Sequence, residues 1–330
     1  MRSAIEALPG SRIREVANAG LGRDDVLAFW FGESDEVTPE PVREAAARSL
    51  RDGETFYSHN LGLAELRAGI AAYQSALHGP IGVDRIAVTS SGVSALMIAM
   101  QMLAGAGDQV VAVVPVWPNL TAQPAILGAE VARVPLRPDA AGEWRLDVDE
   151  LCAAVTARTR VLLVNAPNNP TGWTLTRAEQ QALLAHGRRT GTWILADEVY
   201  ERIWFGDGPS APSFLDIAAP EDRLVVAHSF SKSFLMTGWR LGWLVLPPSH
   251  LDAAGKLLEF NSSCAPVFAQ RGAQAALGIA DRFVPGLVQR LRDGRDRLAA
   301  GLAALPGVTV ATRPAGMYAF FRIDGRDASL

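Results

Sequence analysis

The chain has 330 residues, 49% of them hydrophobic, and a formal net charge of −4. This length fits one large domain, or a large and a small one, with a sizeable core. The small charge argues against a nucleic-acid partner or a polybasic membrane anchor. The two cysteines, Cys152 and Cys264, lie outside any CxxC or Cys/His pattern, which argues against a disulfide framework.

Targeting and metal signals are also absent from the sequence. The N-terminus lacks an apolar targeting segment, and no apolar run reaches the roughly 18 residues that suggest a membrane span. The five histidines show no metal-ligand spacing, and we expect His228 to be structural. We therefore expect a cytoplasmic protein without a metal site or a membrane partner.

The N-terminal part predicts an arm and a short helix within residues 1–25. Val26–Phe31 is apolar and aromatic and predicts a strand, which ends in a turn that begins at Gly32. Thr38 is expected to cap a helix that has Pro39 in its first turn. Leu61–Ala76 has its apolar residues on one face, which is typical of an amphipathic helix.

From residue 86 onward, strand-like and helix-like segments alternate. The expected strands are Ile86–Thr89, Gln109–Val114, Glu130–Pro135, Arg160–Asn165, Thr192–Ala196, Leu224–Ala227 and Leu241–Leu246. The expected helices between them are Val93–Leu103, Leu120–Leu127, Asp149–Ala154 and Arg177–Thr190. This alternation predicts an α/β fold with a mostly parallel sheet that is covered on both faces. Ligands bind beyond the carboxyl ends of such strands.

The C-terminal part predicts three helices, Leu251–Phe260, Phe268–Leu277 and a long one over residues 281–305. Val308–Val310 and Met317–Ile323 then predict two strands of a second, smaller unit.

One lysine, Lys232, lies among small hydroxyl residues between two strand-like segments, in Ser229-Phe-Ser-Lys-Ser. Apolar neighbours would restrain its side chain, and partial desolvation lowers the pKa of an amine. An amine of this kind attacks carbonyl groups to form a Schiff base. The alternative interpretation is an ordinary loop lysine.

Polar and small residues follow several other predicted strands. Ser91-Gly92-Val93 begins a helix, where backbone N–H groups and the helix dipole favour an anion, although an ordinary N-cap explains the same residues. Asn169 lies in a turn. Its side-chain amide either points toward a ligand oxygen or serves only to form the turn. Asp197 follows a very apolar strand, so it needs a cationic partner if it is buried and is not an N-cap.

Taken together, these segments supply the groups that one ligand requires. Trp117 is an aromatic side chain at a strand end, Tyr200 offers a phenol, Val199 lies on the same side as Asp197, and Arg240 offers a guanidinium. With the anion-binding residues and the amine of Lys232, this inventory fits a phosphorylated pyridine aldehyde.

At this point the sequence resembles the class I/II aminotransferases, which are pyridoxal-phosphate enzymes of fold type I. The resemblance rests on four segments in the family's order: Ser229-Phe-Ser-Lys232 with Thr-Gly-Trp-Arg240-Leu-Gly, Asn169-Pro-Thr-Gly172, Ala-Asp197-Glu-Val-Tyr200, and Tyr57 with Gly62 and Glu65-Leu-Arg67. It covers nearly the whole chain.

The resemblance implies a large domain over residues 35–280, with a seven-stranded, mostly parallel sheet between helices. Residues 1–34 and 281–330 would form an N-terminal arm and a smaller α+β domain. The family's chains normally continue beyond a segment like Gly316–Ile323 and carry there an arginine that binds the substrate carboxylate. We therefore expect an incomplete small domain, and Arg313, Arg322 and Arg326 do not match that position.

The resemblance also implies residue roles. Lys232 would carry the cofactor as a Schiff base and move the Cα proton, and Asp197 would pair with the ring nitrogen. Asn169 and Tyr200 would bind the ring oxygen, and Trp117 and Val199 would cover the two ring faces. The phosphate would be held by Ser91, Gly92, Val93, Ser229, Ser231 and Arg240. Gly32, Asn169 and Trp117 would contact the substrate, and Tyr57 would reach the neighbouring subunit's phosphate in a homodimer.

The sequence thus predicts ping-pong transamination from an L-amino acid to a 2-oxo acid. Four alternatives remain open. A lyase or synthase that eliminates at Cβ or Cγ would use the same residues, and a protein with impaired turnover would bind the same cofactor. A cofactor-sensing regulator would need an added DNA-binding domain, and a nicotinamide dehydrogenase would need a glycine fingerprint that is not found.

Overall fold

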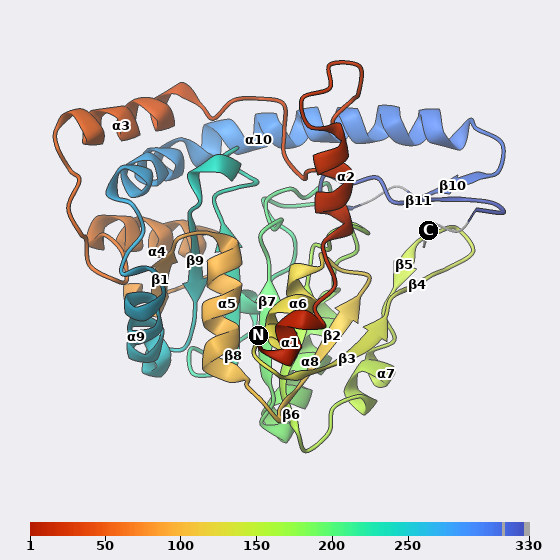
Figure 1. Cartoon of the computed structure of the whole chain (residues 1–330), viewed down its shortest axis with the longest axis horizontal. Helices are drawn as coiled ribbons and strands as arrows, with labels where there is room; N and C mark the ends of the chain where they lie inside the picture. The colour runs from red at the N-terminus through yellow and green to blue at the C-terminus, as the bar shows by residue number, and fades with distance from the viewer. Residues whose placement is uncertain (312–313, 327–330) are drawn as a thin grey trace.

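A seven-stranded sheet with the order β1-β9-β8-β7-β6-β2-β3 forms the centre of the fold (Figure 1). The computed structural model describes residues 1–311 and 314–326. The strands are β1 (Ile86–Thr89), β2 (Gln109–Val114), β3 (Glu130–Pro135), β6 (Thr159–Asn165), β7 (Trp193–Asp197), β8 (Leu224–Ser229) and β9 (Gly242–Val245). The β3-β2-β6-β7-β8 pairs are parallel, whereas β9 runs antiparallel to β8 and to β1. The predicted, mostly parallel sheet is confirmed.

Each central strand is buried on both faces because consecutive apolar residues point to opposite sides. Leu162 and Ile194 belong to the core on one face, and Leu163 and Leu195 belong to the core on the other. The first core is closed by α4 (Ala64–His78), α7 (Val148–Ala153), α8 (Arg177–Thr190) and α10 (Val267–Ala303). The second is closed by α5 (Gly92–Leu103), α6 (Asn119–Ile126) and α9 (Leu251–Ser262).

The N-terminal region differs from the sequence prediction. It holds α1 (Ser3–Glu6), α2 (Arg12–Gly20) and α3 (Glu40–Arg51), but Val26–Phe31 forms no strand. No strand within residues 1–311 and 314–326 offers backbone partners there, and Phe29 is 87% exposed. The predicted N-cap at Thr38 is also wrong. Pro39 occupies the N-cap position, and the Thr38 hydroxyl donates instead to the Leu235 carbonyl at 2.5 Å.

The two C-terminal helices predicted on either side of Gly278 are one helix, α10, which runs along the top of Figure 1. Ala276, Ala280, Val284 and Leu287 are all buried at helical spacing, so one apolar stripe continues across the expected break. The predicted domain boundary between residues 280 and 281 lies inside this helix. The division into a large and a small domain therefore stays a prediction.

Short strand pairs complete the fold. β10 (Val308–Val310) pairs antiparallel with β11 (Phe321–Ile323), so the second predicted strand is shorter than Met317–Ile323. β4 (Arg137–Pro138) pairs with β5 (Trp144–Arg145). Arg313 lies outside the described residues. Among the described helices, none is both long and apolar enough to cross a membrane.

A buried polar cluster joins α4 to the segments that follow β7. His78 contacts Asp216 through Nδ1 (2.6 Å) and Glu201 through Nε2 (3.0 Å). Burial alone would lower the pKa of His78, but the two carboxylates outweigh this effect and raise it to about 10. His78 is therefore a buried cation that holds two acidic side chains in place.

Glu198, Glu201 and His228 of this region also bring potential metal-ligand atoms within 4.8 Å of one another. Both Glu198 oxygens already accept hydrogen bonds, from the Ser213 hydroxyl and the Phe214 amide. The Glu201 carboxylate is bound by Gln74 and His78. These bonds account for the carboxylates without an ion, and the expectation of no metal stays a prediction.

Replacing His78 with Gln removes the buried cation while Glu201 and Asp216 keep their charges. We expect the free energy of unfolding at pH 7 to fall by about 3–5 kcal/mol, as when one partner of a buried ion pair is removed. The folded-state pKa lies above the unfolded value, so the contribution of His78 is complete below about pH 6.5 and is lost as the pH rises toward 10. Urea unfolding at pH 7 and pH 10 measures both effects.

The matched control is His59→Gln, because His59 is exposed. It should change the free energy of unfolding by less than about 0.5 kcal/mol. A difference between wild type and His78→Gln that stays constant up to pH 10 would contradict the assignment of a charged His78.

Candidate active site

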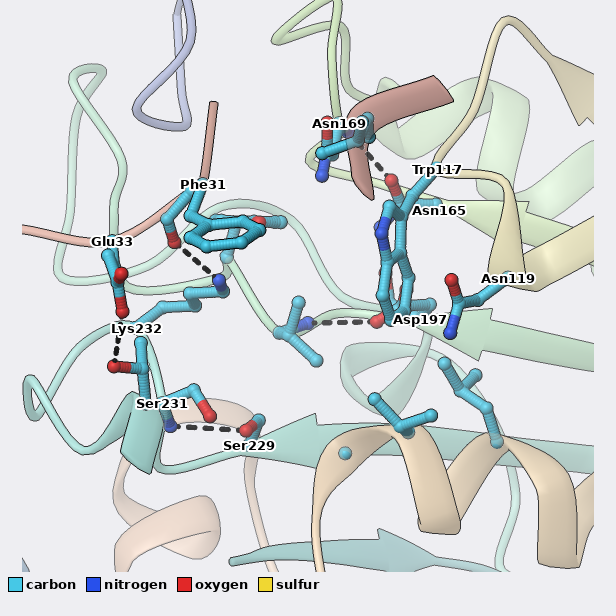
Figure 2. A pocket seen from close by; sticks show the side chains of 18 of the residues that line it. Phe31, Glu33, Trp117, Asn119, Asn165, Asn169, Asp197, Ser229, Ser231 and Lys232 are labelled. Atoms are coloured by element: carbon cyan, nitrogen blue, oxygen red, sulfur yellow. Dashed lines mark hydrogen bonds between the residues drawn. The ribbon is translucent and has the colours of Figure 1, made fainter. Parts of the chain in front are cut away.

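A cavity of about 560 Å³ lies at the carboxyl ends of β6, β7 and β8 (Figure 2). All but two of the residues that the sequence analysis assigned to one site line this cavity. They are Gly32, Gly92, Val93, Trp117, Asn169, Asp197, Val199, Tyr200, Ser229, Ser231, Lys232 and Arg240. The two exceptions are Ser91, which lies buried behind the wall, and Tyr57, which is 89% exposed and outside the cavity.

Lys232 is held by the turn that follows β8. Phe230 and Phe234 on either side of it are fully buried, which fixes the backbone of the turn. The Lys232 ammonium donates a hydrogen bond to the Gly32 carbonyl at 2.6 Å. Burial lowers the pKa of Lys232 to about 8, although the charges of Asp197 and Glu33 act in the opposite direction.

The chain has only one other lysine, Lys256, on the exposed surface of α9. Lys256 forms an ion pair with Asp252 that is one turn away on the same helix. The two lysines therefore differ in burial, in partner and in distance from the cavity, and only Lys232 is placed for chemistry there.

Asp197 is the last residue of β7 and is 2% exposed. Its carboxylate accepts one weak hydrogen bond, from the Val199 amide at 3.5 Å, and no cationic side chain of residues 1–311 or 314–326 forms an ion pair with it. Burial raises its pKa to about 7, an effect that Lys232 only partly offsets. A buried carboxylate without a partner favours a cationic group in the cavity beside it.

The amide of Asn165 at the end of β6 connects this strand to its neighbours. Its nitrogen donates to the Asp197 carbonyl at 3.0 Å, and its oxygen accepts from the Asn169 amide at 2.7 Å. The Asn169 carbonyl in turn accepts from the Trp117 amide at 2.9 Å. One chain of hydrogen bonds thus fixes the loops that carry Asp197, Asn169 and Trp117.

A cradle for an anion lies at the first turn of α5. Gly92 and Val93 are its first two residues, where backbone N–H groups lack intrahelical partners. The Ser91 hydroxyl accepts from the Ser94 amide at 2.9 Å, so Ser91 acts as the N-cap. The Arg240 guanidinium and the hydroxyl residues Ser229 and Ser231 line the same cavity.

Close backbone packing brings these segments together. A Cβ atom at Gly242, at the start of β9, would lie 2.6 Å from the Gly92 nitrogen and from the His228 carbonyl. Only glycine fits there, so β9 and β8 press directly on the first residue of α5. Arg240 adopts a left-handed conformation (φ +51°) just before this contact, a backbone state that is unfavourable for side chains other than glycine and is often associated with functional sites.

Comparison with known proteins agrees with this geometry. Residues 25–329 match the family described as aminotransferase class I and II. The chain is 30% identical over 322 residues to the aspartate aminotransferase of Pyrococcus horikoshii, covering 97% of this chain and 81% of that protein. It is 31% identical over 299 residues to the arginine–pyruvate transaminase AruH of Pseudomonas aeruginosa, covering 89% and 74%.

A crystal structure of the aspartate aminotransferase of Thermotoga maritima superposes with a TM-score of 0.92 at 31% identity, covering 99% of this chain and 86% of that one. The chain belongs to the class I and II aminotransferases. It is therefore an aminotransferase, and aminotransferases of this class use pyridoxal phosphate.

The cavity of this aminotransferase fits pyridoxal phosphate on three observations. It contains a buried amine with a lowered pKa, a buried carboxylate that lacks a cationic partner, and an anion cradle at a helix N-terminus. An aldehyde, a protonated ring nitrogen and a phosphate are the complementary groups.

Several lining residues of this aminotransferase were not predicted as site residues. Asn165 is the last residue of a predicted strand, and ligands were expected at the carboxyl ends of these strands. Its position in the sequence could therefore have identified it as a site residue. Tyr318, Ile13 and Arg14 come from segments far from Lys232 in the sequence. Ile13 and Arg14 belong to no recognised motif, and Tyr318 lies in the family-like segment Gly316–Ile323, to which no site role was given. The sequence left open whether Trp30 and Phe31 lie near the pocket or in the core of a short strand. Both line the cavity, with the Arg14 guanidinium 4.9 Å from the centre of the Phe31 ring.

We expect the unpaired carboxylate of Asp197 to lower the free energy of unfolding of the cofactor-free protein. Its folded-state pKa of about 7 lies above the unfolded value, so the folded state binds more protons between about pH 4 and pH 7. Stability therefore falls as the pH rises through this range, by about 4 kcal/mol from this group. We expect Asp197→Asn to remove this loss, and urea unfolding at pH 4 and pH 8 measures it.

Asp35→Asn serves as the control, because Asp35 is exposed. It should leave the pH dependence as it is in the wild type. Equal stabilities of Asp197→Asn and wild type at pH 8 would show that the carboxylate is compensated in the folded protein.

Proposed function

We propose that this aminotransferase moves the amino group of an L-amino acid to a 2-oxo acid, in a ping-pong cycle, at the cavity that contains Lys232. The observation that carries this proposal is the buried Lys232 amine in one cavity with the unpaired carboxylate of Asp197. Aminotransferase relatives at about 30% identity support the reaction class. A cytoplasmic location remains an expectation from the sequence.

Bound pyridoxal phosphate supplies an aldehyde that condenses with amines and a ring that withdraws electrons from the substrate Cα. Asp197 would hold the ring nitrogen in its protonated form, because a buried carboxylate strongly favours an adjacent cation. Asn169 and Tyr200 would donate hydrogen bonds to the ring oxygen. Trp117 and Val199 would pack against the ring.

The cofactor phosphate would be held at the first turn of α5. The backbone N–H groups of Gly92 and Val93, with the positive end of the helix dipole, favour a dianion there. Ser91 would fix this turn as its N-cap, and Ser229, Ser231 and Arg240 would contribute the side chains that line the same part of the cavity.

Lys232 would act as the proton carrier. Its Nζ would take a proton from the substrate Cα and deliver it to the carbon of the cofactor's former aldehyde group, which requires an amine that is neutral in a sizeable fraction of molecules near neutral pH. The lowered pKa of about 8 meets this requirement. The Gly32 carbonyl, which accepts from Nζ at 2.6 Å, orients the amine, and the backbone of Gly32 would also face the substrate carboxylate.

The experiment that tests the function compares the two lysines of the chain. We expect wild type and Lys256→Ala to show a visible absorbance band with added pyridoxal phosphate, a band that an amino acid removes and a 2-oxo acid restores. Lys232→Ala should lose the band and at least about 10³-fold in kcat, since it lacks both the amine and the proton carrier.

Borohydride reduction followed by peptide mass spectrometry identifies the attached residue directly. The cofactor mass should appear on the peptide that contains Lys232 and not on the one that contains Lys256. Modification of Lys256 alone, or an unaltered band in Lys232→Ala, would refute the assignment.

A homodimer with a shared site is part of this proposal. Phe56 and Tyr57 are 84% and 89% exposed, and Phe260 on α9 is 87% exposed. The two segments meet nearby, where the Asn60 amide donates to the Gly255 carbonyl at 2.9 Å. Large exposed apolar side chains that gather in one region are typical of a protein interface. Tyr57 would cross this interface to the phosphate of the neighbouring subunit.

Hybrid dimers test the shared site. In a dimer of one Lys232→Ala chain and one Tyr57→Ala chain, the second chain's site keeps its own Lys232 and receives the intact Tyr57 of the first. We expect an equal mixture, unfolded and refolded together, to regain about a quarter of wild-type sites, since half of the dimers are hybrids with one intact site. Activity that stays at the mean of the two separate variants would contradict a shared site.

A further inference from the structure

Tyr318 brings a second phenol into the cavity from the segment that precedes β11. Its hydroxyl oxygen lies 2.6 Å from the hydroxyl oxygen of Tyr200 and 3.0 Å from the Asn169 side-chain nitrogen. The two phenol rings meet edge to face, with centres 5.8 Å apart. Tyr318 thus contacts both side chains that would bind the ring oxygen of the cofactor.

The position of Tyr318 is fixed by its surroundings. The ring packs in a small apolar cluster with Tyr200, Ile203 and Phe205. A Cβ atom at Gly32 would lie only 1.8 Å from the Tyr318 hydroxyl oxygen, so the hydroxyl rests directly against the backbone of Gly32. The Gly32 carbonyl is the acceptor for Lys232, and the Lys232 Nζ lies 5.6 Å from the centre of the Tyr200 ring.

The donor and acceptor roles of Asn169, Tyr200 and Tyr318 follow from the chemistry of their side chains. The Asn169 side-chain nitrogen only donates, so the Tyr318 oxygen accepts from it. The same amide also acts on Tyr200 through a side-chain hydrogen bond, so both phenols face Asn169. If Tyr200 is to donate into the cavity as well, its one proton is not available for Tyr318, and the proton between the two phenols must come from Tyr318.

We propose that Tyr318 is a positioning residue that donates its phenolic proton to the Tyr200 oxygen and thereby holds Tyr200 as a hydrogen-bond donor toward the cofactor. This inference rests on the proposed function, in which Tyr200 binds the ring oxygen. It adds a role for a residue to which the sequence analysis gave none.

Donation from Tyr318 polarises the Tyr200 O–H bond, which makes Tyr200 a stronger donor. A stronger donor stabilises negative charge on the cofactor oxygen. This charge arrangement lowers the proton affinity of the Lys232 nitrogen when that nitrogen is joined to the cofactor. Without the Tyr318 hydroxyl, that nitrogen should keep its proton to a higher pH. The visible absorbance band of the loaded enzyme reports this change without any turnover.

Other ionisable groups also face the two phenols. Asp197 and Lys232 act on Tyr200 from β7 and from the turn after β8, and Glu33 and Arg240 act on Lys232. None of them hydrogen-bonds to Tyr318 in the described residues. Their effects are therefore the same in a Tyr318 variant and in the wild type, and they cancel in the comparison.

The experiment is a pH titration of the visible band in four enzymes loaded with pyridoxal phosphate: wild type, Tyr318→Phe, Tyr200→Phe and the double variant. We expect the midpoint to rise by about one pH unit in Tyr318→Phe, the value of one buried hydrogen bond, and by more in Tyr200→Phe. Because Tyr318 acts through Tyr200, the double variant should titrate like Tyr200→Phe alone.

Tyr73→Phe is the matched control, since Tyr73 is a partly buried phenol that is bonded to Arg202 away from the cavity, and its midpoint should equal that of the wild type. Urea unfolding verifies that each variant is folded, and Tyr318→Leu provides a second variant without the hydroxyl, in which the same shift is expected.

Two results would overturn the inference and leave the proposed function intact. One is a titration midpoint in Tyr318→Phe that equals the wild-type midpoint. The other is a midpoint shift in the double variant that equals the sum of the two single shifts. A wild type with no band would overturn the proposed function and this inference together.

Discussion

The buried, unpaired carboxylate of Asp197 is the constraint on which the site depends. It lies at the end of a strand that is covered on both faces, it is almost fully buried, and no cationic side chain of the described residues forms an ion pair with it. A fold that keeps such a group is less stable than one with an apolar residue there. The cost is offset when a cationic ligand binds, so stability and cofactor affinity are two aspects of one interaction.

The sheet makes this arrangement possible because its parallel strands end at the same edge. Asn165, Asp197 and Ser229 terminate three neighbouring strands, and each ends beside the cavity. Hydrogen bonds from Asn165 join the first two strand ends to the loop of Asn169. The buried cation His78 joins α4 to Glu201 and Asp216 in the segments that follow β7. These contacts hold in place the chain that continues from Asp197.

Local patterns in the sequence were sufficient for the sheet and for most of the cavity. Apolar runs identified every strand of the central sheet, and the residues that follow those runs proved to line one cavity. The failures arose where the outcome depends on distant partners. Val26–Phe31 has the composition of a strand but lacks a neighbouring strand, and Thr38 binds the Leu235 carbonyl rather than its own helix. Tyr318 is brought to the cavity by tertiary packing alone, which no local pattern encodes.

The contact between Gly32 and Tyr318 has an evolutionary consequence. Because a side chain at position 32 would overlap the Tyr318 hydroxyl, most substitutions at 32 are compatible only with a smaller residue at 318. The two positions, nearly three hundred residues apart, are therefore epistatic, and the order of substitution matters. A lineage that changes position 318 first can then explore position 32, whereas the reverse order passes through a disrupted site.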